Sequence, residues 1–383
     1  MTDPVYPLDL PASRRRYTFN GSAALYAALL DSQLERGAAV LLPAYCCGAE
    51  LGPFEQLGCT LFFYDINADF SIRREEVARI LRDQPDIRVL LLTHYLGLAQ
   101  PDVEAIAELC RSSGVCLIED CAHALYTEDE TGRPLGQSGD YAIFSMRKSL
   151  PLSEGGAVVG KQELQAVSLR PPSRSSSTAW LSRVAYSFQQ GARSGSKKGL
   201  SRLLAGVSII AWTLPAVLAK VARRTGLQPA SDWLTPDVEG AAAQPVYGQG
   251  MSAFSHRLLM SADGQQIRRR RRANHAHWVR QVAQIDGVEP VHQELPEGAC
   301  PLYFVARVSN PGQCVKLLEM SDIEAFNWWQ HLSSCIVWSD FPIARQYKQS
   351  LLALPLHQQL QESDITHMAT CLSVVVDAGR KDS

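Results

Sequence analysis

A serine, a lysine and two glycines stand close together in the middle of the chain. The apolar run 141–144 predicts a buried strand that stops at Ser145, and Lys148 follows three residues later, before a Glu-Gly-Gly turn at 154–156. A lysine held between two buried strands is desolvated, which favours its neutral, nucleophilic amine and allows a Schiff base with an aldehyde. The alternative is a surface lysine on an ordinary loop, and this stretch alone favours that alternative.

A second candidate site lies near the N-terminus. Gly21 and Ser22 open an Ala- and Leu-rich stretch, 23–30, with the composition of a helix. Free backbone N–H groups and the helix dipole at such an N-terminus favour a phosphate. A serine that only caps the helix explains the same dipeptide without a ligand, and that alternative stays open.

Short apolar runs alternate with segments of helical spacing between these two stretches. Strands are predicted at 39–42, 59–64, 89–93 and 115–118, and helices at 48–56, 72–81 and 103–109. This alternation favours an α/β domain with a mostly parallel sheet that is buried on both faces. Ligands gather at the carboxyl ends of such strands, where the sequence places His94, Asp120 and Ser145.

The composition is that of an ordinary globular protein. The chain has 383 residues and a formal net charge of −2, which predicts two domains and no general attraction to nucleic acid. Its 10 cysteines include no paired C-x-x-C elements, so we expect reduced thiols, no metal site and a cytoplasmic protein. Residues 1–10 show no secretory signal, and no G-x-G-x-x-G motif follows the first strand.

Four segments together resemble the DegT/StrS family of sugar aminotransferases. Residues 118–124 resemble that family's I-E-D-x-A-[QH]-A signature, and 93–97 resemble its V-H-x-x-G segment. Residues 21–25 resemble its G-T-x-A-L segment, and Lys148 with 154–156 resembles its K…G-E-G-G segment. These relatives are enzymes of pyridoxal 5′-phosphate (PLP) with the aspartate-aminotransferase fold (fold type I).

The resemblance implies a role for each motif residue. Lys148 would bind PLP as a Schiff base and, once released, move a proton between the substrate carbon and the aldehyde carbon. Asp120 would keep the pyridine nitrogen protonated, and His123 would lie against the ring. The further cofactor contacts expected are the backbone N–H groups of Gly21, Ser22 and Ala23, the hydroxyl of Ser145, and Tyr45 as a wall of the site.

Two features depart from the family pattern. Ser145 and Lys148 are closer together than in many relatives, where two more residues intervene. Many relatives also carry an Asn that reaches the phosphate in the neighbouring subunit, whereas the corresponding stretch 247–252 has none. That contact is therefore either lost or supplied by Gln249.

The resemblance implies a large PLP-binding domain, with a mostly parallel sheet flanked by helices, and a smaller C-terminal α/β domain. We assign residues 1–165 and part of 245–275 to the large domain and 276–383 to the small one. Residues 166–245 are predicted as a family-atypical insertion. Its apolar segment 203–219 is shorter than the roughly 20 residues of a spanning helix. It is predicted to pack on the active-site mouth or a partner subunit, with peripheral membrane contact as the alternative.

Two further clusters, one of arginines and one of aromatic residues, are predicted to have structural roles. The arginine run 268–272 is predicted as a solvated helix face, with contact to nucleotide phosphates as the alternative. The aromatic residues at 326–329 are predicted to pack in the core, with contact to a sugar or base as the alternative.

These features predict a PLP-dependent aminotransferase that moves an amino group from glutamate or glutamine to a keto sugar, expected to be nucleotide-linked. The product would serve polysaccharide or secondary-metabolite sugar biosynthesis, and the resemblance implies a homodimer. Sugar dehydration is one alternative, although dehydratases of the family tend to replace the lysine with histidine. A non-catalytic binding or regulatory protein on the same fold is another.

Overall fold

The computed structural model describes residues 9–152, 154–171 and 246–381. The predicted insertion 166–245, with its apolar segment 203–219, lies almost entirely outside these residues. No helix in the described part of the chain is both long and apolar enough to cross a membrane.

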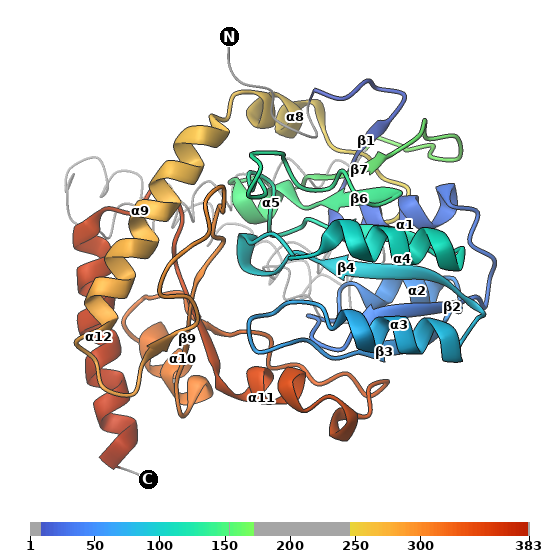
Figure 1. The fold of residues 1–383 in the computed structure, drawn as a ribbon. Coiled ribbons are helices and arrows are strands. Elements are labelled where there is room, and N and C mark those ends of the chain that lie inside the picture. Colours follow the sequence, from blue (N-terminus) through green and yellow to red (C-terminus); the bar gives the residue numbers. More distant parts are fainter. Residues whose placement is uncertain (1–8, 153, 172–245, 382–383) are drawn as a thin grey trace, which may run out of the picture.

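A seven-stranded sheet forms the larger part of the molecule (Figure 1). Its strand order is β1-β7-β6-β5-β4-β2-β3. The five neighbouring strands β6, β5, β4, β2 and β3 run parallel, whereas β7 and β1 join them through antiparallel pairs. The strands are β1 (Arg15–Thr18), β2 (Ala39–Pro43), β3 (Thr60–Tyr64), β4 (Ile87–Thr93), β5 (Cys116–Asp120), β6 (Tyr141–Phe144) and β7 (Gly156–Gly160). The mixed α/β fold with a mostly parallel sheet is therefore confirmed.

Helices cover both faces of this sheet because its strands are apolar on both sides. Val40 and Leu42 pack on the same side as α1 and α2, whereas Leu41 packs on the side of α3 and α4. The helices are α1 (Gly21–Asp31), α2 (Leu51–Gln56), α3 (Arg74–Asp83), α4 (Val103–Ser113) and α5 (Met146–Ser149), with a 3-10 turn η1 (Tyr95–Gly97).

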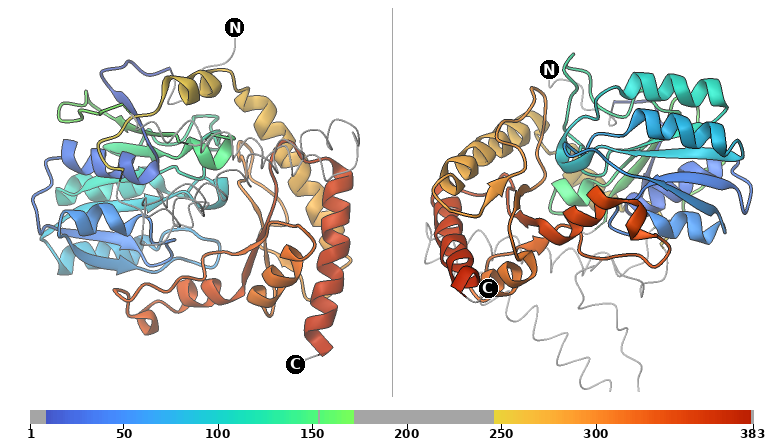
Figure 2. Two further views of the ribbon diagram at one scale, coloured as in Figure 1. Left: turned by 180° about the vertical axis from the view of Figure 1, so that it is seen from behind. Right: turned by 60° about the horizontal axis from the view of Figure 1, so that its bottom comes forward.

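A smaller antiparallel sheet lies beside the large one (Figure 2). It contains β8 (Glu289–Pro290), β9 (Phe304–Arg307), β10 (Phe326–Asn327) and β11 (Leu351–Leu354), in the order β10-β11-β9-β8. The accompanying helices are α8 (Ala253–Met260), α9 (Gly264–Val282), α10 (Pro311–Glu319), α11 (Pro342–Ser350) and α12 (Glu362–Lys381), with a 3-10 turn η3 (Trp338–Asp340). The predicted boundary between residues 275 and 276 falls inside α9, and the domain division stays a prediction.

Buried polar contacts join the two sheets. The Asp65 carboxylate, which follows β3, accepts hydrogen bonds from the N–H groups of Ile343 and Ala344 in the first turn of α11. A carboxylate at a helix N-terminus satisfies donors that have no partner within the helix. Gly97 lies so close to the backbone of Cys300 that an added Cβ would stand 2.0 Å from the Cys300 carbonyl oxygen. The glycine of the V-H-x-x-G segment is therefore required by this close approach.

All cysteines are free thiols in the structure. Most of them are buried, and burial raises the pKa of Cys46 and Cys110 to about 12. The reduced state of these thiols stays a prediction.

Candidate active site

The candidate site forms where three parallel strands end side by side. Thr93 at the end of β4 pairs with Asp120 at the end of β5, and Asp120 pairs in turn with Ile143 of β6. His94 and Ser145 directly follow β4 and β6, so the structure brings His94, Asp120 and Ser145 to one edge of the sheet. This is the edge at which the sequence places them.

Lys148 and His123 are in contact at this edge. The Lys148 Nζ atom lies 3.2 Å from the His123 Nε2 atom. Lys148 stands in the single-turn helix α5, just beyond the end of β6, and is half-buried. Burial lowers the pKa of His123 well below its ordinary value, with the Lys148 charge as the second cause. The imidazole is therefore neutral at pH 7 and can accept a hydrogen bond from the lysine.

Asp120 is a buried carboxylate close to this pair. Its Oδ1 atom accepts a hydrogen bond of 2.8 Å from the N–H group of Ala122. Burial raises the pKa of Asp120 to about 6; Glu50 raises it further, and Lys148 opposes the shift. Among the described residues Asp120 forms no ion pair, so a cationic group placed against it would be stabilised.

The N-terminus of α1 adjoins Ser145. A Cβ atom added to Gly21 would lie 3.2 Å from the Ser145 Cβ atom and 3.6 Å from its Oγ atom. The N–H groups of Gly21 and Ser22 stand in the first turn of the helix and have no helical acceptor. The N–H of Ala23 donates to the Asn20 side chain at 2.8 Å, so the predicted third donor is already used.

Tyr45 does not contact His123 directly, because the Trp329 ring lies between them. The side chain is completely buried, and its hydroxyl donates to the Trp328 carbonyl at 2.8 Å. Trp329 packs between Tyr45 and His123, with ring centroids 5.3 Å from each. The wall nearest His123 is therefore formed by Trp328 and Trp329, which the sequence assigned to core packing.

A buried lysine fixes this aromatic wall. Lys348 of α11 is 2% exposed and donates to the backbone carbonyls of Cys46, Trp329 and His331 at 2.6, 3.1 and 2.8 Å. Its ammonium also lies over the Tyr45 ring, 5.6 Å from the centroid. No sequence motif marks Lys348, because its acceptors are backbone atoms of distant segments.

The Glu-Gly-Gly turn is docked against the segment that lacks the family's Asn. The Glu154 carboxylate accepts hydrogen bonds from the hydroxyls of Ser252 and Ser255. A Cβ atom added to Gly155 would lie 3.0 Å from the Met251 side chain. Residues 247–252 therefore run close to the turn that follows Lys148.

Comparisons with known proteins agree with this geometry. A model of the DegT/DnrJ/EryC1/StrS aminotransferase family matches residues 17–209, just over half of the chain. The chain belongs to this family. The resemblance in the sequence is thereby confirmed, together with the cofactor expected at family level, because aminotransferases of this family bind PLP.

The GDP-perosamine synthase of Vibrio cholerae is 29% identical to the chain over 148 residues, which are 38% of this chain and 39% of that relative. The match thus spans well under half of the relative's length. The aminotransferase TlmJ of Streptoalloteichus hindustanus has a TM-score of 0.66 at 19% identity, over 97% of this chain and 88% of TlmJ. The PLP-form of the putative sugar aminotransferase Spr1654 of Streptococcus pneumoniae has a TM-score of 0.64 at 15% identity, over 95% and 87%.

The residues present fit PLP. The buried Asp120 carboxylate lacks a cationic partner among the described residues, and a pyridinium nitrogen would supply one. The buried His123 Nδ1 atom has no hydrogen-bond partner in the described part of the chain. The first turn of α1 and the Ser145 hydroxyl offer donors of the kind that bind a phosphate.

Proposed function

We propose that this protein is a PLP-dependent aminotransferase that transfers an amino group from glutamate or glutamine to a nucleotide-linked keto sugar. The contact between the Lys148 amine and the neutral His123 ring, beside the buried Asp120 carboxylate, carries the proposal. A primary amine, a proton acceptor and a buried acid at one sheet edge are the groups that such a reaction needs.

In the proposal each residue has a distinct task. Lys148 binds the aldehyde and, when free, carries the proton between the two carbons of the transfer. Asp120 holds a proton on the ring nitrogen, and His123 lies against the ring. PLP, when bound, supplies a ring that accepts the electrons of the broken C–H bond. Gly21, Ser22 and Ser145 bind the phosphate, with Ala23 as part of the same turn and Tyr45 as support for the wall.

The sugar part of the proposal rests on the similarity to GDP-perosamine synthase, whose name states a nucleotide-linked product. The polysaccharide or secondary-metabolite setting, the cytoplasmic location and a homodimer belong to the same proposal. The segment 247–252 lies beside the Glu154 turn, which favours a subunit contact near the site if Gln249 replaces the family's Asn.

The visible absorption spectrum of the purified protein tests the proposal. We expect an absorption band of bound PLP that disappears when glutamate is added, because the amino group then moves to the cofactor. Lys148→Ala should lack the native band, since it cannot bind the aldehyde covalently. Arg147→Lys, which alters the neighbouring residue but retains Lys148, is the matched control and should keep the band. A colourless protein whose spectrum does not change when PLP is added would refute the proposed aminotransferase activity and favour a non-catalytic role.

A further inference from the structure

The arginine run on α9 contains one buried guanidinium. The sequence predicts a solvated helix face for this run, and that interpretation is wrong for Arg271, which is only 2% exposed. Arg269, on the same helix, is exposed as predicted. The buried position requires Arg271 to satisfy its donors within the protein.

Arg271 satisfies them with backbone and amide oxygens. Its NH2 atom donates to the Ser149 carbonyl at 3.1 Å, its NH1 atom to the Pro301 carbonyl at 3.2 Å, and its Nε atom to the Gln358 side chain at 3.0 Å. No carboxylate among the described residues forms an ion pair with it. The buried Arg271 guanidinium therefore binds oxygen atoms of three segments that are distant in sequence.

One of these oxygens belongs to the turn that carries Lys148. Ser149 follows Lys148 and is the last residue of α5, which has 4 residues. So short a helix is not stable by itself, and its last carbonyl groups lack partners within the helix. The Ser149 carbonyl accepts from Arg271 and also from the Gln358 side chain, at 3.3 Å. The end of the Lys148 turn is therefore held from outside the large sheet.

The other oxygens tie that turn to the part of the chain around the small sheet. Pro301 follows Cys300, whose N–H donates to the Gly97 carbonyl at 3.2 Å. Gln358 lies just after β11. Arg271 thus connects the Lys148 turn, the Cys300 junction and the end of a small-sheet strand at one point.

We infer that Arg271 is a positioning residue for Lys148: it fixes the α5 turn so that the lysine amine reaches the aldehyde of PLP. The inference rests on the proposed function, because it assigns Lys148 that bond. Arg271 reaches this turn through the Ser149 carbonyl, and its Nε and NH1 donors are taken by Gln358 and Pro301. Its effect should therefore fall on covalent attachment and leave the recognition of the phosphate and ring largely intact.

Two ligands separate these effects. PLP can bond to Lys148, whereas pyridoxine 5′-phosphate lacks the aldehyde and binds only through its phosphate and ring. For Arg271→Met we expect an affinity for PLP at least about tenfold lower, since a misplacement of about 1 Å can cost a hundredfold in a positioned reaction. The affinity for pyridoxine 5′-phosphate should be little changed. Arg269→Met, at the exposed neighbour, should alter neither affinity.

Hydrogen exchange gives a second readout that does not depend on the cofactor. The N–H groups of Lys148 and Leu150 donate to the carbonyls of Ser145 and Met146, so they report opening of the turn. Their peptide should exchange faster in Arg271→Met, and in the milder variants Arg271→Lys and Gln358→Leu, than in the wild type or Arg269→Met. The two milder variants carry the test if Arg271→Met does not fold.

The outcomes distinguish this inference from the proposed function. A wild-type protein that binds PLP and pyridoxine 5′-phosphate equally well would refute the proposed function and, with it, the role of Arg271 toward PLP. A wild type that prefers PLP, with the same preference retained in Arg271→Met, would refute only the inference. Unchanged exchange of the 146–150 peptide in all three variants would also refute it.

Discussion

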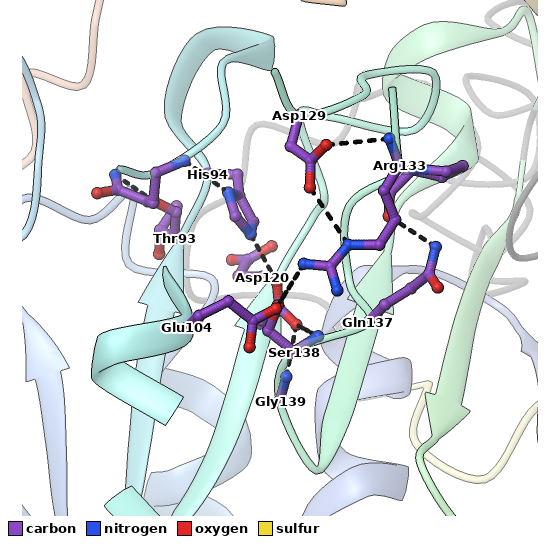
Figure 3. Close-up of polar contacts among 12 residues, drawn as sticks. Thr93, His94, Glu104, Asp120, Asp129, Arg133, Gln137, Ser138 and Gly139 are labelled. Atoms are coloured by element: carbon purple, nitrogen blue, oxygen red, sulfur yellow. Dashed lines mark hydrogen bonds and ion pairs between the residues drawn. The ribbon is translucent and has the colours of Figure 1, made fainter. Parts of the chain in front are cut away.

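Glu119 and Asp120 are consecutive carboxylates at the end of β5, and their surroundings are opposite. Glu119 accepts hydrogen bonds from the N–H groups of Ser138 and Gly139, both at 2.7 Å, and lies 3.0 Å from the His94 ring. Figure 3 labels these three partners, His94, Ser138 and Gly139. Asp120 accepts one hydrogen bond, from Ala122, and has no ion pair among the described residues. Successive side chains of a strand point to opposite faces, so one step along the chain separates the two environments.

The His94 ring is oriented to serve Glu119. Its Nδ1 atom accepts a hydrogen bond of 3.0 Å from the Gln100 N–H group. The Nε2 atom therefore carries the ring proton and donates a hydrogen bond to the Glu119 carboxylate. The histidine of the V-H-x-x-G segment therefore holds the ends of β4 and β5 together.

The pKa values of Glu119 and Asp120 are shifted in opposite directions because their hydrogen-bond partners differ. Burial alone would raise the pKa of Glu119, but His94 and the amides of Gly139 and Ser138 outweigh burial, and the pKa is lowered. Burial dominates at Asp120 and raises its pKa to about 6. A saturated buried carboxylate stabilises the fold, whereas an unsaturated one retains an affinity for a cation that is not part of the chain.

Amide substitutions at the two positions should give opposite phenotypes. Asp120→Asn should slow the reaction with glutamate by about a hundredfold or more, because the lost charge stabilises the reacting group. The cofactor-free protein should be at least as stable as the wild type at pH 7, since a desolvated charge is removed. Stopped-flow absorbance and urea unfolding measure the two effects.

Glu119→Gln is the matched variant. Its free energy of unfolding should fall by about 2–3 kcal/mol, because the buried carboxylate accepts from three N–H donors and an amide group cannot accept from all of them equally well. Its rate with glutamate, measured well below the unfolding temperature, should stay near that of the wild type. Two results would contradict the contrast between the two carboxylates. One is a Glu119→Gln variant that reacts slowly with glutamate but keeps the wild-type stability. The other is an Asp120→Asn variant that loses stability but reacts at the wild-type rate.

The pH dependence of stability should also differ in sign. The folded Asp120 binds its proton more tightly than the unfolded one, so the cofactor-free protein gains stability at this site as pH falls from above 6 toward 4. The gain is about 2–3 kcal/mol for a rise from an unfolded pKa near 3.9. Glu119 stabilises the fold above its unfolded pKa of about 4.3, and this contribution is lost as pH falls further.

Urea unfolding of the cofactor-free protein at a series of pH values checks this prediction. Relative to Asp120→Asn, the wild type should become more stable between pH 7 and pH 4. Relative to Glu119→Gln, it should lose its advantage below about pH 4.3. Stability curves of wild type and either variant that run parallel over these ranges would be inconsistent with it.

The sequence predicts the large sheet and the motif residues well, because both depend on local signals. Continuous apolar runs mark the parallel strands, and the polar residue after each run lies at the shared edge. His123 is found by its place in a contiguous motif with Asp120. Its contact with Lys148 then follows from neighbouring strands that end together.

The sequence predicts poorly what depends on distant backbone atoms. Trp329 reaches His123 across some two hundred positions, and no periodicity marks that approach. Lys348 and Arg271 are both buried cations, but their partners are carbonyl groups of other segments. A charged residue is ordinarily exposed, so the sequence gives no sign that either side chain is buried, and for Arg271 it predicts the opposite.

The smallest effect is expected at the outer rim of the Glu119 network. Glu104 accepts a hydrogen bond from the Ser138 hydroxyl and pairs with Arg133 (Figure 3), but its side chain is 59% exposed. Glu104→Gln should lower the free energy of unfolding by no more than about 1 kcal/mol, as for other exposed pairs. The loss should shrink in high salt, which screens such pairs. The Ser138 N–H is held by Glu119 independently of Glu104. A loss as large as that of Glu119→Gln would therefore mean that the rim and the buried carboxylate act as one unit.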